Sequence, residues 1–175
     1  MNSRLVSTPG LYLVGFMGSG KSTIGAALAD ELGWYFADLD SDIEAAAGAA
    51  ITAIFETAGE PEFRRHEHAA LEARVRAVQR GRPTVVSLGG GAFTFAANIS
   101  LVQDNGISIW LDCAFDLIQA RVARERHRPL AHDPDRFEAL YHARKPLYAK
   151  ADYRIEVTCD DPQAAVNAIL NLPGL

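Results

Sequence analysis

The sequence "GFMGSGKST", from Gly15 to Thr23, is the stretch that decides the fold. It matches the P-loop pattern, in which four residues separate a first glycine from Gly-Lys-Ser. The apolar segment 11–14 before it predicts a short buried strand, and segment 21–33 after it has the apolar spacing of a helix that stops at a glycine. A strand, a glycine loop and a helix in this order are typical of a nucleotide phosphate site. A plain glycine-rich turn, the alternative, would not need the Lys-Ser pair.

The residue types of this loop fit phosphate chemistry. Glycines let backbone N–H groups face an anion without a Cβ in the way. We expect Lys21 to reach the β- and γ-phosphates and Ser22 to ligate Mg²⁺. A P-loop identifies only the phosphate donor, because GTPases, motor-type ATPases and small-molecule kinases share it. The loop residues predicted to bind nucleotide are Gly18, Ser19, Gly20, Lys21, Ser22 and Thr23.

The rest of the 175 residues alternates between predicted strands and predicted helices, which suits a single domain. This order indicates an α/β fold with a five-stranded parallel sheet flanked by helices on both faces. We expect the helix at 136–151 to be kinked or interrupted at Pro146. Ligands of such sheets bind beyond the carboxyl ends of the strands. The predicted strands are 11–14, 34–40, 84–88, 107–112 and 153–157.

Two acids, Asp38 and Asp40, end the second predicted strand. They alternate, so within a strand both carboxylates would point to the same side. Two acids beside a triphosphate would repel it unless a metal lies between them or one acid faces a hydroxyl. We therefore predict Asp38 near the metal and Asp40 toward an acceptor alcohol, as general base or orienting group. The alternative is an N-cap of the next helix, a role that Ser41 or Asp42 could also fill. The third strand ends in Ser87 without an acid, which favours Asp38 at the metal.

Arginines and glycines in the middle of the chain predict a pocket for a small anionic acceptor. Arg64 and Glu67 share a helix face and can pair, which would fix the guanidinium for bidentate binding of a carboxylate. Arg144 is a second candidate for the same carboxylate. The "GGG" at 89–91 allows the backbone to approach a ligand closely. A solvent-facing charge is the alternative for either arginine alone.

Composition limits the partners and the compartment. The net charge of −5 argues against a nucleic-acid partner. The two cysteines form no CxxC pair and fit a reducing compartment. Residues 1–10 lack the apolar core of a signal peptide, and no apolar run reaches membrane-spanning length. We therefore expect a cytoplasmic protein without a membrane partner. No feature fixes the oligomeric state, and a monomer is the simplest expectation.

Taken together, six motifs resemble those of shikimate kinases, in the same order and at similar spacing over nearly the whole chain. The P-loop is generic, whereas the middle and late motifs are specific. The resemblance implies a P-loop kinase fold of the nucleoside-monophosphate-kinase type. It implies Mg²⁺-dependent transfer of the ATP γ-phosphate to the 3-hydroxyl of shikimate, in the pathway to chorismate and aromatic amino acids. The motifs are "GFMGSGKST", "DLDSDIE", "ITAIFETAGEPEFRRHE", "SLGGGA", "RPL" and "RKPLY".

The resemblance also assigns the acceptor side, in a helical region at about 40–67. It implies that Asp40 contacts the acceptor hydroxyl. It implies that Arg64 and Arg144 bind the shikimate carboxylate and that Gly90 donates a hydrogen bond to the substrate.

On the donor side, the resemblance implies that Arg121 lies near adenine and that Arg128, in a mobile lid at about 124–137, approaches the phosphates. Lys21, Asp40 and Arg128 are then the catalytic residues. The lid "RPLAHDPD" and the loop "TCDDP" depart from the family's pattern, and a basic residue is common in the second. The acids at 160 and 161 would not make that contact, so base recognition would rest on backbone and Arg121.

Two other functions are compatible with parts of the pattern. One is a related kinase for another small polyol or sugar acid such as gluconate. The other is a nucleotide-binding module that has lost catalysis. The joint presence of Lys21, Ser22, Asp40, Arg64 and Arg128 argues against the second alternative.

Overall fold

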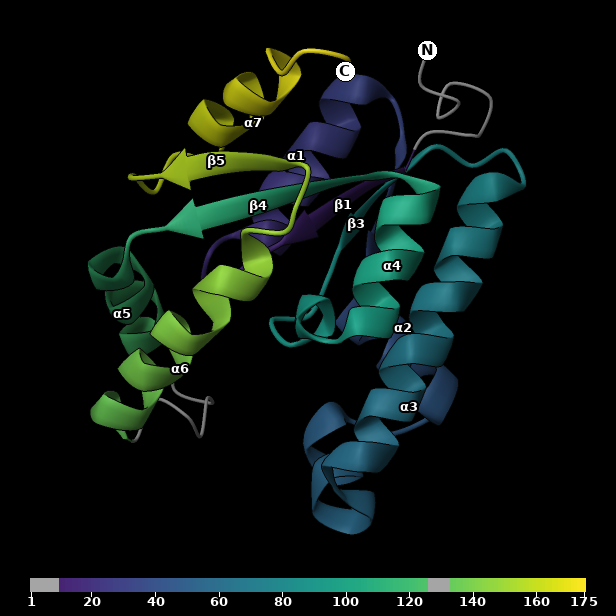
Figure 1. Cartoon of the computed structure of the whole chain (residues 1–175), viewed down its shortest axis with the longest axis vertical. Helices are drawn as coiled ribbons and strands as arrows, with labels where there is room; N and C mark the ends of the chain where they lie inside the picture. Colours follow the sequence, from purple (N-terminus) through teal and green to yellow (C-terminus); the bar gives the residue numbers. More distant parts are fainter. Residues whose placement is uncertain (1–9, 126–132) are drawn as a thin grey trace.

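A computed structural model describes residues 10–125 and 133–175 of the chain. Its centre is a sheet of five parallel strands in the order β2-β3-β1-β4-β5, which confirms the predicted fold class (Figure 1). The strands are β1 (Gly10–Val14), β2 (Tyr35–Asp38), β3 (Thr84–Ser87), β4 (Ile107–Cys113) and β5 (Tyr153–Val157).

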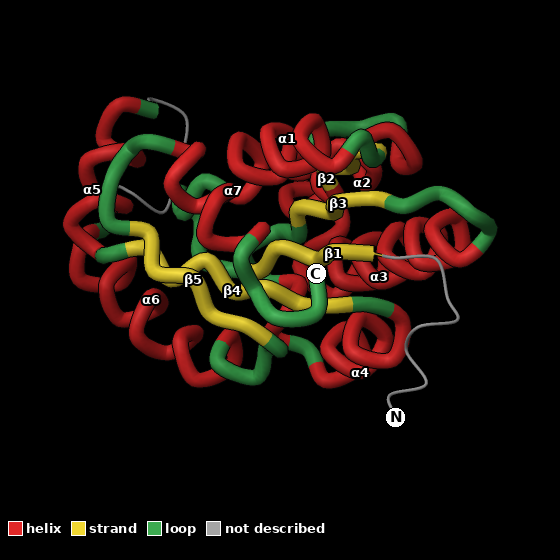
Figure 2. The backbone as a smooth tube through the Cα atoms, turned by 90° about the horizontal axis from the view of Figure 1, so that it is seen from above, coloured by secondary structure: helices red, strands yellow, loops and turns green. Residues whose placement is uncertain are grey.

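Helices cover both faces of this sheet. Helices α1 and α7 pack together on one side, and α3 and α4 lie on the other (Figure 2). The central strand β1 is buried at every position, as expected for the apolar run of a central parallel strand, whereas the edge strands β2 and β5 keep exposed positions. The helices are α1 (Lys21–Leu32), α2 (Leu39–Ala47), α3 (Ile51–Gln79), α4 (Ala96–Asn105), α5 (Phe115–Arg124), α6 (Pro134–Tyr148) and α7 (Pro162–Leu170), with a 3₁₀ turn η2 (Ala92–Thr94).

Local signals account for most helix ends. Gly33 and Gly48 end α1 and α2 in the left-handed conformation. Asp133 and Asp161 cap α6 and α7 through their carboxylates, each ahead of a proline in the first turn. Gly59, at φ 80° and ψ 175°, breaks α3 where the sequence predicted one helix to stop and the next to begin.

The structure corrects three expectations. The second strand ends at Asp38, and Asp40 lies in the first turn of α2, so the two acids do not alternate along one strand. Helix α6 runs through Pro146 to Tyr148 with no interruption; Pro146 lies in the last turn, so the helix ends two residues after the one backbone N–H that is missing. Helix α4 was not predicted, because it begins at Ala96 without a side-chain cap.

Loss of the hydroxyl should affect the free energy of unfolding differently at two buried tyrosines, Tyr148 and Tyr12. Tyr148 O–H donates to the Gly90 carbonyl, whereas the hydroxyl of Tyr12 has no hydrogen-bond partner in the described part of the chain. Tyr148→Phe should lower the free energy of unfolding by about 0.5–1.5 kcal/mol, the net value of a typical hydrogen bond, because it removes the bond to a partly buried carbonyl. Tyr12→Phe should leave that free energy unchanged or raise it. Urea unfolding of both variants checks the contrast, and equal losses would contradict it.

Burial raises the pKa of both phenols from 10.0 to about 12. A raised folded-state pKa means that the protonated form is preferred in the folded protein. The stabilisation from these neutral phenols is therefore complete below pH 10 and is lost as pH rises through about 12.

Candidate active site

The P-loop connects the end of β1 to the first residue of α1. Its backbone is left-handed at Gly18 and Gly20, and α1 begins at Lys21, as predicted from the sequence. The Lys21 ammonium donates to the carbonyls of Gly15 at 2.8 Å and Phe16 at 2.9 Å. A cationic head group is thus held inside the loop at the positive end of a helix, where an anion is stabilised.

A cavity of about 460 Å³ opens beside this loop. It is also bordered by α5 and by the β5–α7 connection. Most of the predicted nucleotide-binding residues line it, namely Gly18, Gly20, Lys21, Ser22, Thr23 and Arg121. Ser19 does not, because its side chain is fully buried behind the loop. Arg128 and half of the predicted lid, at 126–132, lie outside the described residues.

Three oxygen-bearing side chains meet on the floor of this cavity. Ser22 Oγ donates to Asp38 Oδ2 at 2.5 Å and lies 3.4 Å from Ser87 Oγ. The other oxygen of Asp38 accepts from the backbone N–H groups of Asp40 and Ser41, so Asp38 caps α2 as well. Both roles weighed for Asp38 are therefore geometrically compatible, since each uses a different oxygen.

This oxygen set fits a small hard cation. Mg²⁺ prefers oxygen ligands, and it is usually held by one or two carboxylates together with waters and substrate phosphates. Among the described residues there is no group of three or more His, Cys, Asp or Glu side chains that could hold a metal alone. The predicted ligands Ser22 and Asp38 would therefore bind the ion together with the phosphates of a nucleotide.

A second cavity, of about 210 Å³, adjoins the first. It is enclosed by α3, α6, the P-loop and the "GGG" segment, and it brings together Arg64 and Arg144, which are far apart in the sequence. The two cavities share Met17, Asp40, Gly89 and Gly90 in their walls. Among the residues that the structure describes, Asp40 is the only carboxylate in this shared wall, so it lies where a ligand in one cavity would meet a ligand in the other.

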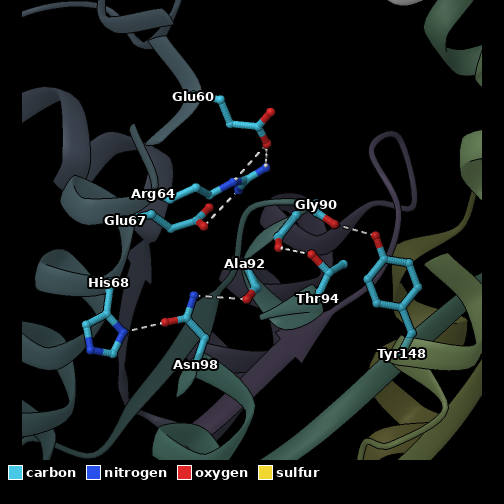
Figure 3. Close-up of polar contacts among 10 residues, drawn as sticks. Glu60, Arg64, Glu67, His68, Gly90, Ala92, Thr94, Asn98 and Tyr148 are labelled. Carbon is cyan, nitrogen blue, oxygen red and sulfur yellow. Dashed lines mark hydrogen bonds and ion pairs between the residues drawn. The ribbon is translucent and has the colours of Figure 1, made fainter. Parts of the chain in front are cut away.

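Two carboxylates and two aromatic rings hold Arg64 at the second cavity (Figure 3). Its Nη1 donates to Glu67 at 2.8 Å, while Nε and Nη2 donate to Glu60 at 3.3 and 3.1 Å. Its guanidinium carbon lies 5.1 Å from the centre of the Phe63 ring and 4.7 Å from that of Phe95. The predicted pairing with Glu67 is confirmed; Glu60 and Phe95 were missed, although the spacing of four residues from Glu60 to Arg64 was a usable signal.

Glu67 is a buried partner of Arg64, since the Glu67 side chain is only 1% exposed. Burial raises the pKa of the Glu67 carboxyl above its ordinary value, and the nearby Arg64 guanidinium opposes that rise. Asp40 adds to the rise through charge repulsion. The acceptor-side carboxylates and arginines therefore form one electrostatic group.

The three glycines after β3 make room for these side chains. A Cβ at Gly89 would lie 2.7 Å from Asp40 Oδ1, and one at Gly91 would lie 2.7 Å from Arg64 Nη2. Both distances are too short for a real side chain. On the other side of the segment, Tyr148 points at the Gly90 carbonyl and fixes the loop (Figure 3). A side chain at Gly89 or Gly91 would thus displace Asp40 or Arg64 from its present position.

A family model described as shikimate kinase matches residues 17–172 of the chain. The chain belongs to the shikimate kinase family. Family membership confirms the activity predicted from the sequence, an ATP-dependent phosphotransferase with shikimate as acceptor.

Relatives support the assignment along the whole kinase domain. A shikimate kinase of Sulfurihydrogenibium sp. is 40% identical over 161 residues, covering 91% of this chain and 95% of its own. One of Cereibacter sphaeroides is 42% identical over 149 residues, covering 83% and 73%. The structure of the Acinetobacter baumannii shikimate kinase in complex with shikimate is similar at a TM-score of 0.85 and 36% identity, covering 97% and 95%.

Several remaining features of the chain bear on the predictions. Both cysteines are free thiols, with Cys113 buried and Cys159 exposed at the larger cavity. Within the described ranges, no helix is both long enough and apolar enough to span a bilayer. Arg65, next to Arg64, is 78% exposed and pairs with Glu62, as expected of a surface charge.

Proposed function

We propose that the larger cavity holds ATP, that the smaller holds shikimate, and that phosphate passes between them at Asp40 to the 3-hydroxyl. The single observation that carries this proposal is the shared wall of the two cavities, in which Asp40 supplies the carboxylate. Phosphoryl transfer is catalysed mainly by positioning and charge stabilisation, so two adjoining sites with a carboxylate between them suit the reaction.

On the donor side, the P-loop backbone from Gly18 to Thr23, Ser19 included, would hold the phosphates through its N–H groups. Lys21 would exchange its carbonyl partners for the β- and γ-phosphates and stabilise charge in the transition state. Arg121 would lie against the base, and Arg128 would approach the phosphates from the lid. The lid role stays a prediction, because residues 126–132 lie outside the described ranges.

Mg²⁺ bound by Ser22 and Asp38 would neutralise charge on the phosphates. The fit rests on the oxygen character of both side chains and on their 2.5 Å contact. Asp38 keeps one oxygen on the α2 backbone, which fixes its carboxylate and leaves the other oxygen directed at Ser22.

On the acceptor side, the shikimate carboxylate would bind to Arg64 and Arg144, with a hydrogen bond from the Gly90 backbone. This leaves the 3-hydroxyl at Asp40, which would accept its proton or orient it for attack. Arg64 is already oriented by Glu67 before the acceptor arrives, so little reorganisation is needed.

We further propose that the enzyme works in the cytoplasm as a monomer. Its two free thiols suit a reducing compartment. The described walls of both cavities come from one chain, so the proposed site does not need a second copy.

A coupled ADP-release assay tests the function directly. The purified enzyme should release ADP from ATP with shikimate, and release little with gluconate or with no acceptor. Chelation of divalent metal should abolish the activity, and added Mg²⁺ should restore it. Equal release with gluconate would favour the other acceptor class, and no release with any acceptor would favour a silent nucleotide-binding module.

A further inference from the structure

The β5–α7 connection carries an acid, Asp160, on the wall of the larger cavity. It is not directed at the solvent alone. Its Oδ1 accepts from Arg121 Nε at 2.8 Å, and its Oδ2 lies 3.9 Å from Arg124 Nη1. The neighbouring Asp161 does something else, since it caps α7 by accepting from the Gln163 N–H. Asp160 therefore engages the arginine that we place against the donor base.

All three nitrogens of the Arg121 guanidinium donate to the protein. Nε donates to Asp160, Nη1 to the Gly18 carbonyl at 3.0 Å, and Nη2 to the Cys159 carbonyl at 3.2 Å. Guanidinium N–H bonds lie in the plane of the group, so acceptors on all three nitrogens fix that plane. Nη1 also lies 3.7 Å from Cys113 Sγ, so most of the N–H edge of the group is engaged by the protein and its flat faces are the main surface that it offers to a ligand. A guanidinium face stacks well on an aromatic ring.

Asp160 is the only charged group among these three acceptors. Arg121 is 19% exposed, so its charge is partly removed from water and gains from an anionic partner. The two carbonyls belong to separate segments, the P-loop and the β5–α7 connection, and Arg121 bridges them. Asp160 holds this bridging arginine through its Nε.

We propose that Asp160 is a positioning residue for the donor base: it fixes the plane of Arg121 so that a face of the guanidinium meets adenine. The inference rests on the proposed donor site. In this proposal the β5–α7 connection does not contact the base directly. Asp160 instead acts on the base through Arg121. Recognition of the base then depends on a pair of side chains rather than on backbone and arginine alone.

The test separates base binding from phosphate binding by calorimetry on the intact protein. The probes are ADP and inorganic tripolyphosphate, which carries phosphates without a base. Asp160→Ala should weaken ADP binding by about 2- to 5-fold relative to tripolyphosphate, the range for loss of a partly exposed ion pair. Asp160→Asn, which keeps an oxygen acceptor for Nε, should fall between Asp160→Ala and the wild type. In steady-state kinetics the KM for ATP should rise, while kcat and the KM for shikimate stay near wild type.

Glu156→Gln is the matched control, because Glu156 is an exposed carboxylate on β5 that pairs with Arg154 and does not border the cavity. It removes the same charge without touching Arg121. The proposal is overturned if Asp160→Ala leaves the ratio of the two affinities unchanged, or if Glu156→Gln changes that ratio equally. Neither result depends on the acceptor, so a failure here is distinguishable from a lack of shikimate-dependent ADP release.

Discussion

Asp40→Asn should lower kcat by about 10²- to 10⁴-fold, the usual contribution of a general acid–base group, and leave ATP affinity near wild type. The amide is almost the same size as the carboxylate but takes no proton. Asp40 lies in the shared wall of the two cavities, and its backbone N–H, rather than its side chain, bonds to Asp38. Single-turnover kinetics report the transfer step, and calorimetry reports ATP binding.

Asp42→Asn is the control for this prediction. Asp42 belongs to the same helix, but its carboxylate binds Arg74 at 2.6 to 2.9 Å and borders neither cavity. Its loss should affect stability more than turnover. If Asp40→Asn instead keeps transfer and loses nucleotide binding, Asp40 belongs with Asp38 at the metal, and the proposed division of roles between the acids is wrong.

Arg64→Ala should reduce kcat/KM for shikimate by about 30- to 5,000-fold, the range that corresponds to about 2–5 kcal/mol for one partner of a desolvated charge pair. Arg64→Lys should lose much of the same amount, because a lysine keeps the charge but not the planar fork. Arg64→Ala also leaves the Glu67 carboxylate, which is 1% exposed, without its arginine partner, and this lowers the stability of the folded protein. ATP affinity should stay near wild type, since Arg64 borders only the smaller cavity.

The measurement compares shikimate with an analogue whose carboxylate is replaced by a neutral amide. The wild type should strongly prefer the acid, and Arg64→Ala should lose most of that preference. Arg65→Ala is the control, because Arg65 is the next residue on the helix and is 78% exposed. Full retention of the preference in Arg64→Ala would mean that this arginine does not bind the acceptor carboxylate.

Much of the architecture could be predicted because its signals are local. Apolar runs, glycine stops and the P-loop spacing identified all five strands and the start of α1. The pairing of Arg64 with Glu67 also followed from helical spacing alone. Arg144 was already a candidate for the same carboxylate and the family motifs supported it, but no local rule could supply its approach to Arg64.

The errors occurred where two local preferences competed. Asp38 could extend the strand or cap a helix, and the cap prevailed because it satisfies the backbone N–H groups of Asp40 and Ser41. As a result, Asp40 lies in the first turn of α2 rather than in the strand. The engagement of Arg121 by Asp160 could not be predicted either, since it joins residues 39 positions apart through tertiary packing.

The "GGG" segment has a consequence for enzyme redesign. Asp40 on α2, Arg144 on α6 and Arg64 on α3 approach Gly89, Gly90 and Gly91 respectively, at 2.7, 3.5 and 2.7 Å from the positions of the absent side chains. Side chains from three helices thus pack against one segment of backbone that carries no side chains. A library that varies this segment would disturb the reacting groups before it altered the shape of the acceptor pocket. A new acceptor is better sought by varying the surrounding helices, with the glycines left as the fixed reference for the site.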